Sequence, residues 1–201
     1  MSPELLGWLA SVVYLSRLLP QPIRLTRTGL PEGISTVAAM NAVISDAAWI
    51  AYGLQAGLLP VWLVALVGVV PGVWTVGLLR REVDRGDLVR SGAWLAVIMV
   101  AALVGGLGVI LAASVLVNVG PQVWTALRSN DLRGLSAFTW VLAIGDGLLW
   151  GAYGWVVADV ALLAYAGVLV TGALIVLLRM AMTRSFTTDL AGPAVPALEG
   201  A

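Results

Sequence analysis

Long apolar segments recur along the whole chain at nearly regular intervals. A membrane-spanning helix needs about 20 predominantly apolar residues, because it must cross roughly 30 Å of hydrocarbon at about 1.5 Å per residue. Seven segments have this character, at residues 4–23, 35–54, 58–79, 88–104, 105–127, 136–156 and 159–179. The sequence therefore predicts an all-α polytopic membrane protein with seven transmembrane helices.

The composition agrees with a chain that resides in a bilayer. Of its residues, 60% are hydrophobic and only 11% are charged, whereas about a quarter of a soluble domain is charged. The chain has no cysteine and no histidine, which excludes disulfides, Cys-ligated or His-ligated metals and histidine-based catalysis. The formal net charge is zero, and no basic block suggests nucleic acid. We expect the lipid bilayer as a partner and no cofactor.

The arginines decide whether residues 91–127 form one helix or two. Short cytoplasmic loops collect arginine. With two helices that meet at 105–108, the arginines of the first, third and fifth loops and of the C-terminal segment all fall on one side of the membrane. The other side then carries Glu4 and Asp159 and no arginine. The pattern predicts seven helices in a plasma membrane, with the N-terminus outside and the C-terminus in the cytoplasm.

Two stretches of the chain repeat each other at a fixed offset of 101 residues. Residues 20–53 and 121–154 align without gaps, and ten of the 34 paired positions are identical. Apolar composition does not explain the shared proline, glutamine, tryptophan and tyrosine, which are Pro20/Pro121, Gln21/Gln122, Trp49/Trp150 and Tyr52/Tyr153. A single linker helix leaves the two units parallel, and such repeats commonly place a solute path at their interface.

These residues resemble the PQ-loop superfamily. Pro-Gln ends the first helix of each unit, Gly-x-Ser begins the second, and Trp-x-x-Tyr-Gly ends it. The three-one-three arrangement is similar to the SWEET branch, whose members are mostly facilitative sugar transporters. The resemblance implies two parallel triple-helix bundles joined by a linker helix. We expect a first repeat at 1–80, a cytoplasmic loop and linker helix at 81–104, a second repeat at 105–181 and a disordered cytoplasmic tail at 182–201.

The duplicated Pro-Gln pair is predicted to form a hinge. Proline inside a helix removes one backbone hydrogen bond and clashes with the preceding turn. Pro20 and Pro121 lie about one turn before the cytoplasmic arginines, where a hinge could open an inner gate. Gln21 and Gln122 could then bond the freed carbonyls. The alternative is a static kink that only shapes packing.

Aromatic and polar residues at mid-depth are candidates for binding a solute. A tryptophan face can stack on a sugar ring while its indole N–H donates to a hydroxyl, although tryptophan is also common in interfacial belts. Amide, hydroxyl and carboxyl groups lie at similar depth, and Asp146 shares a helix face with Trp150. The predicted solute site comprises Trp49, Trp150, Asn41, Asn118, Ser45 and Asp146.

Three charged residues lie inside the predicted helices and away from their ends: Arg17, Asp46 and Asp146. A charge at the centre of a helix costs about 2.5–3.5 kcal/mol on insertion scales, so it needs a partner or a wet cavity. Arg17 can hold only one of the two acids, and the other could carry protons. Asp146 is the better candidate for the proton site because it shares a face with Trp150. A purely structural pair between Arg17 and one carboxylate is the alternative.

The sequence thus predicts a transporter of a small polar solute that works by alternating access, with a SWEET-like facilitative sugar transporter as the first interpretation. The second is a proton-coupled transporter of an amino acid or another organic solute. The third is a receptor or assembly subunit without transport. A homo-oligomer is compatible with each of them. An intramembrane aspartyl protease would need Tyr-Asp and Gly-x-Gly-Asp, but Asp46 follows Ser45 and residues 143–146 read Ala-Ile-Gly-Asp. We therefore do not expect an enzyme.

Overall fold

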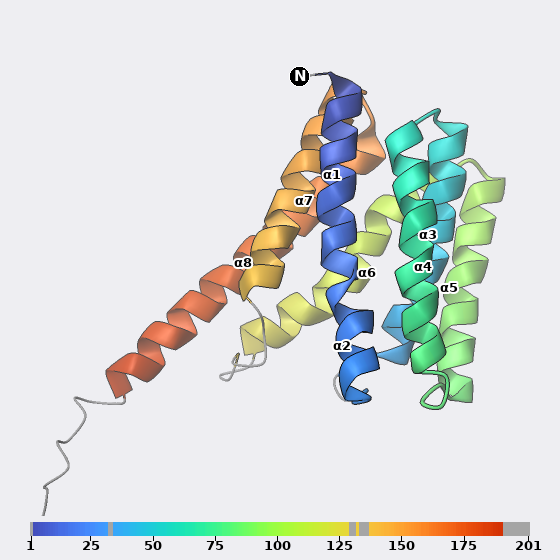
Figure 1. Ribbon diagram of the computed structural model, residues 1–201. Helices are drawn as coiled ribbons and strands as arrows, with labels where there is room; N and C mark the ends of the chain where they lie inside the picture. Colours follow the sequence, from blue (N-terminus) through green and yellow to red (C-terminus); the bar gives the residue numbers. More distant parts are fainter. Residues whose placement is uncertain (1, 32–33, 129–131, 133–136, 191–201) are drawn as a thin grey trace, which may run out of the picture.

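The computed structural model describes residues 2–31, 34–128, 132 and 137–190, and this part of the chain is helical without strands (Figure 1). Its helices are α1 (Pro3–Leu18), α2 (Pro20–Thr28), α3 (Thr36–Gln55), α4 (Leu59–Leu78), α5 (Arg85–Leu103), α6 (Leu107–Arg128), α7 (Ala137–Val156) and α8 (Val160–Leu190). Helix α2 continues α1 after a bend, so the arrangement is the predicted seven-helix one. Within the described residues, α3, α4, α5, α6 and α8 each have the length and apolarity to cross a membrane.

The first Pro-Gln pair divides its helix, whereas the second does not. Leu19 keeps a right-handed helical backbone (φ −69°, ψ −36°), and Pro20 then starts α2. Because proline lacks the N–H that would continue the ladder, the helix bends here without unwinding. Helix α2 ends at Gly29, whose φ of 65° lies in the left-handed region that glycine tolerates. Helix α6 runs without interruption through Pro121.

Helix α8 is longer than the sequence indicated. It continues past the predicted end at residue 179 to Leu190, so residues 182–190, which we had assigned to the disordered tail, are helical. Residues 180–190 contain neither glycine nor proline, and nothing stops the helix before Gly192 and Pro193. The rest of the predicted tail, residues 191–201, lies outside the described residues.

Each unit places its third helix between the other two. Helix α4 packs against α1 and α3, and α8 packs against α6 and α7; within the described residues, the backbones of α1 and α3 do not pack directly on each other, and neither do those of α6 and α7. The units meet crosswise, with α1 on α7 and α3 on α6. Since the first helix of each unit contacts the second helix of the other, the two are related by a pseudo-two-fold axis, as the 101-residue repeat requires.

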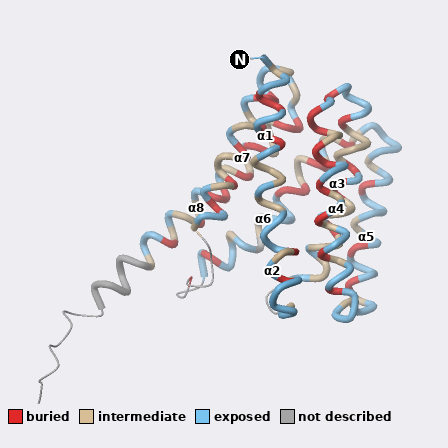
Figure 2. The backbone as a smooth tube through the Cα atoms, viewed as in Figure 1, coloured by how far each residue is buried: buried red, intermediate tan, exposed pale blue. Residues whose placement is uncertain are grey.

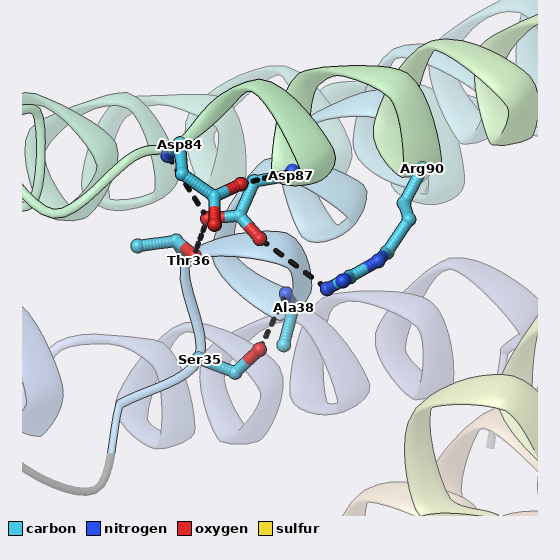
Figure 3. A network of polar contacts seen from close by, with 6 residues as sticks. All are labelled: Ser35, Thr36, Ala38, Asp84, Asp87 and Arg90. Atoms are coloured by element: carbon cyan, nitrogen blue, oxygen red, sulfur yellow. Dashed lines mark hydrogen bonds and ion pairs between the residues drawn. The ribbon is translucent and has the colours of Figure 1, made fainter.

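The linker helix α5 packs on α3 and α6, and polar contacts fix its beginning to the first unit (Figure 3). The backbone N–H groups of Asp84 and Asp87 each donate to the other residue's carboxylate, which forms a capping box. The Thr36 hydroxyl, at the start of α3, donates to the same Asp87 carboxylate. Arg90 lies 3.5 Å from Asp87 but is mostly exposed, so this ion pair adds little.

Many large apolar side chains of the bundle are exposed, and buried and exposed stretches alternate along the helices (Figure 2). Val70, Leu103 and Val109 are 66%, 83% and 77% exposed. In water such an apolar surface would cause the protein to aggregate. In a bilayer it contacts lipid tails of similar polarity, so its exposure carries no free-energy penalty. One buried apolar cluster draws on α1, α4, α7 and α8, and therefore joins the two units. Its members include Leu6 and Tyr153, which lie toward the end of the bundle away from the arginine-rich loops.

Candidate functional site

A cavity of about 530 Å³ lies between the two units. Its wall takes residues from α1, α3 and α4 of the first unit and from α6, α7 and α8 of the second. Exposed side chains of Gln21, Ser35 and Gln122 line it near the arginine-bearing loops, so the cavity opens at that end. In Figure 1 the lower halves of α6 and α8 diverge from α2 to α5 at the same end. The volume is within the range of small-molecule sites, about 300–1,000 Å³.

The two units close together at the opposite, arginine-poor end. The Tyr52 hydroxyl on α3 donates to the Asp159 carboxylate of the second unit at 2.7 Å. The other oxygen of Asp159 accepts from the Leu162 backbone N–H, which holds the carboxylate at the start of α8. Gly7 on α1 lies against Pro60 and Tyr153, where any side chain would overlap the proline ring. These contacts lie beyond the deep end of the cavity and separate it from this face of the bundle.

Trp49 and Trp150, the repeated tryptophans, both line the deep end of this cavity. Each packs edge-on against the tyrosine one turn further along its helix, with ring centroids 5.7 Å apart for Trp49 and Tyr52 and 5.8 Å for Trp150 and Tyr153. The repeat thus produces a pair of indoles, one from each unit, that bound the same space. Both tryptophans are therefore part of the cavity wall, and the tyrosines behind them belong to the closed end.

An ion pair crosses between the units beside these tryptophans. The Arg17 guanidinium lies 3.1 Å from the Asp146 carboxylate, and it donates to the Tyr165 hydroxyl at 3.3 Å. Tyr165 in turn donates to Asp146 at 2.9 Å. Asp146 is completely buried behind this pair, while Arg17 and Tyr165 line the cavity. One positive charge from α1 therefore compensates the acid on α7.

Asp46 occupies a different environment. Its carboxylate accepts a hydrogen bond of 2.6 Å from the Tyr14 hydroxyl, and the residue lines the cavity. Among the described residues, Asp46 forms no ion pair. Tyr14 also places its ring 5.8 Å from the Arg17 guanidinium, which is consequently close to both acids but in contact with only one. The structure thus selects Asp146 as the arginine's partner and leaves Asp46 facing the cavity.

Comparison with known proteins identifies the repeat and the fold. The PQ-loop repeat family matches residues 3–62, which hold α1, α2, α3 and the first residues of α4. The chain carries a PQ-loop repeat and has the SWEET fold. Among solved structures it superposes on a eukaryotic SWEET transporter with a TM-score of 0.73 and 16% sequence identity, over 91% of this chain and 97% of that chain. No curated protein sequence matches it significantly.

The cavity contains most of the predicted site residues but not all of them. Trp49, Trp150, Ser45, Asn118, Gln21 and Gln122 line it. Two predicted solute-binding residues do not: Asp146 lies behind the cavity wall, and Asn41 is buried outside the lining. Ala38, Ala42, Ser45 and Trp49 of α3 line the cavity, whereas Asn41, one position from Ala42, lies just off this face. Pro20 lies at the bend of the first helix, and the side chain of Pro121 lies outside the described residues.

Sequence reasoning missed the two tyrosines that hold the acids, Tyr14 and Tyr165. A signal for them exists in the repeat. At the 101-residue offset, Tyr14 pairs with Val115 and Tyr165 with Val64, so a polar ring replaces an apolar side chain in one unit only. The same loss of symmetry occurs at Arg17, whose partner position is Asn118. Positions where the two units differ in polarity therefore mark this cluster, whereas the shared residues mark the repeat.

Proposed function

We propose that this chain is a membrane transporter of the SWEET/PQ-loop type that carries a small polar solute by alternating access, with a sugar as the first candidate. The PQ-loop match and the SWEET fold favour a transporter over an enzyme. The observation that carries the proposal is the cavity between the two repeated units, which is open at one end and closed at the other. Rocking of such units about a fixed site exchanges the open and closed ends.

The cavity wall suits a hydroxylated ring. Trp49 and Trp150 offer indole faces for stacking, and their position in both units would let them bracket one solute. The buried Ser45 hydroxyl and the Arg17 Nε have no hydrogen-bond partner among the described residues. Asn118 lines the cavity nearer its open end. Buried polar groups without partners favour a solute that can satisfy them, as sugar hydroxyls would.

We infer the orientation in the membrane from the arginines. The cavity opens at the end that carries Arg24, Arg27, Arg80 and Arg128, and arginine-rich loops of this length remain in the cytoplasm. In our proposal the protein lies in the plasma membrane with its N-terminus outside, and the structure corresponds to a state that faces the cytoplasm. The Tyr52–Asp159 hydrogen bond then closes the outer end.

A second candidate is transport coupled to protons, with an amino acid or another organic solute as cargo. The observation that favours it is Asp46, a cavity-lining acid that no arginine pairs among the described residues. The sequence favours Asp146 as the proton site. The structure favours Asp46 instead, because Asp146 forms an ion pair with Arg17 and does not line the cavity. A receptor without transport remains the outcome to exclude by experiment.

The test is solute counterflow in proteoliposomes that contain the purified full chain. Vesicles loaded with an unlabelled monosaccharide or disaccharide should take up the same labelled sugar transiently above equilibrium. The variants Trp49→Ala and Trp150→Ala should lose most of this uptake. Trp155→Ala is the matched control, because Trp155 is 76% exposed on the outside of the bundle. Absence of saturable counterflow for any sugar, amino acid or organic cation tested would exclude transport and favour a receptor.

A further inference from the structure

The positive and negative charges at the deep end of the cavity, which is the end closed by the Tyr52–Asp159 contact, are unequal in number. In their ordinary ionisation states Arg17 contributes one positive charge, and Asp46 and Asp146 contribute two negative charges. Arg17 contacts Asp146 at 3.1 Å, and within the described part of the chain Asp46 has no ion pair. The deep end therefore carries one uncompensated carboxylate. A charge at this depth is expensive unless it faces water or a partner, and here it faces the cavity.

One oxygen of Asp46 lies opposite a glycine in the cavity wall. Oδ1 accepts from the Tyr14 hydroxyl at 2.6 Å, which leaves Oδ2 as the oxygen that Tyr14 does not bond. Across from Oδ2 lies Gly68 on α4, where an added Cβ would be only 3.2 Å from that oxygen. The absence of a side chain at Gly68 thus preserves room in front of the carboxylate. Both residues line the cavity.

The other groups around Asp46 do not supply the missing positive charge. On α1, Tyr14 donates a hydrogen bond to Asp46. Arg17, also on α1, forms its ion pair with Asp146 instead. Helix α4 contributes Gly68, and α8 contributes Tyr165, which donates to Asp146. Aromatic rings near a carboxylate attract cations through their negative faces. Trp49, which packs edge-on against Tyr165 with centroids 5.9 Å apart, adds such a ring to the wall.

We propose that Asp46 binds one positive charge in every transport cycle, so that the transported unit has a net charge of +1. This proposal rests on the proposed transport function and deepens it. When the loaded cavity closes around the solute and excludes water, the carboxylate requires a cation, since Arg17 remains with Asp146. The empty cavity retains its water during the return step, and this water solvates the unpaired carboxylate. The charge has two possible sources that share one site. An ammonium group on the solute can bind Oδ2, or Asp46 can take a proton on one side and release it on the other while a neutral solute binds beside it.

The experiment measures uptake in proteoliposomes across a potassium diffusion potential, with D-glucose and D-glucosamine as a matched neutral and cationic pair. Moving one elementary charge through a membrane potential of 100 mV releases about 2.3 kcal/mol. At equilibrium this energy corresponds to a roughly 50-fold accumulation of a solute that carries one charge. If the solute's ammonium is the source, an inside-negative potential drives glucosamine accumulation without a pH gradient. If the proton is the source, glucose accumulation requires both the potential and an acidic outside.

Asp46→Asn should abolish accumulation of either sugar against its gradient, and downhill glucose uptake, where it persists, should no longer respond to the potential. Glu82→Gln removes an acid on the loop after α4, away from this cavity, and should change nothing. Gly68→Ala, which keeps the charge and crowds Oδ2, should weaken glucosamine binding by roughly tenfold, as read from tryptophan fluorescence of the purified protein. Saturable uptake of both sugars that ignores the potential would overturn this proposal and leave the transport function intact. Absence of uptake, together with equal glucosamine binding by the wild type and Asp46→Asn, would overturn both.

Discussion

Arg17 on α1 lies 3.1 Å from the carboxylate of Asp146 on α7, and this contact joins the first unit to the second. The side chain of Asp146 is 0% exposed and that of Arg17 is 22% exposed. Removing the cation would leave a buried carboxylate without a counter-charge, which typically costs about 3–5 kcal/mol. We expect Arg17→Met to lower the melting temperature of the detergent-solubilised protein clearly. Arg17→Met combined with Asp146→Asn should restore much of it. A single variant as stable as the wild type would mean that the pair contributes no net stability.

The Tyr52–Asp159 hydrogen bond should hold the arginine-poor end closed. A hydrogen bond to a charged group contributes about 1.5–3 kcal/mol, and Tyr52→Phe removes it while Asp159 still caps α8. A cysteine introduced at Val61, in the cavity wall, should then react roughly tenfold faster with an impermeant reagent added from the arginine-poor side. The chain has no native cysteine to interfere. Tyr153→Phe, at the repeated position, is the control, and equal rates in all three proteins would contradict a gating role.

The repeat in the sequence predicted the features that the two units share, which are their helix arrangement and the residues that occur in both. Trp49 and Trp150 occur at a fixed offset, so two units related by a two-fold axis bring both to one interface. The arginine pattern likewise determined the number of helices. These features depend on local sequence and on membrane thickness, and both can be read from a single chain.

The choice of partner for Arg17 could not be predicted in the same way. Both acids lie at similar depth, and the pairing depends on α1 packing against α7 of the other unit. The depth of a residue in the membrane and the helix periodicity can be read from the sequence. They do not specify which helices pack side by side in the plane of the membrane. The same reason explains Asn41, since one residue's rotation about α3 decides whether a side chain enters the cavity or the packed interior.

The bend at Pro20 is expected to control the rate of transport. Pro20→Ala restores a backbone N–H and should straighten α1 into α2, so that the protein folds but exchanges solute roughly tenfold more slowly. Pro121→Ala should have a smaller effect, because α6 is continuous through that position. Pro3→Ala, at the first turn of α1, serves as the control for a proline outside the bend. Normal counterflow in a Pro20→Ala/Pro121→Ala double variant would contradict a hinge role and would mean that both prolines only shape helix packing.

The orientation in the membrane can be tested with single cysteines in the loops. Gln55 ends α3 and Gly105 lies between α5 and α6, both at the arginine-poor end. Arg85 begins α5 at the other end. Cysteines at Gln55 and Gly105 should react with an impermeant reagent added to intact cells, and a cysteine at Arg85 should react only after permeabilisation. The reverse pattern would invert the proposed orientation.

Alternating access is the central claim, and a single cysteine at Ala65 tests it most directly. Ala65 lies on α4 in the cavity wall, and Gln21 and Gln122 line the open end. We predict that a cysteine at Ala65 reacts from the arginine-rich side in the resting protein. Cross-linking cysteines at positions 21 and 122 with a short bifunctional reagent, before the cysteine at Ala65 is probed, should suppress that reaction and increase labelling from the opposite side. Labelling from the arginine-rich side alone, whether or not the open end is cross-linked, would contradict alternating access and indicate a vestibule that never opens across the membrane.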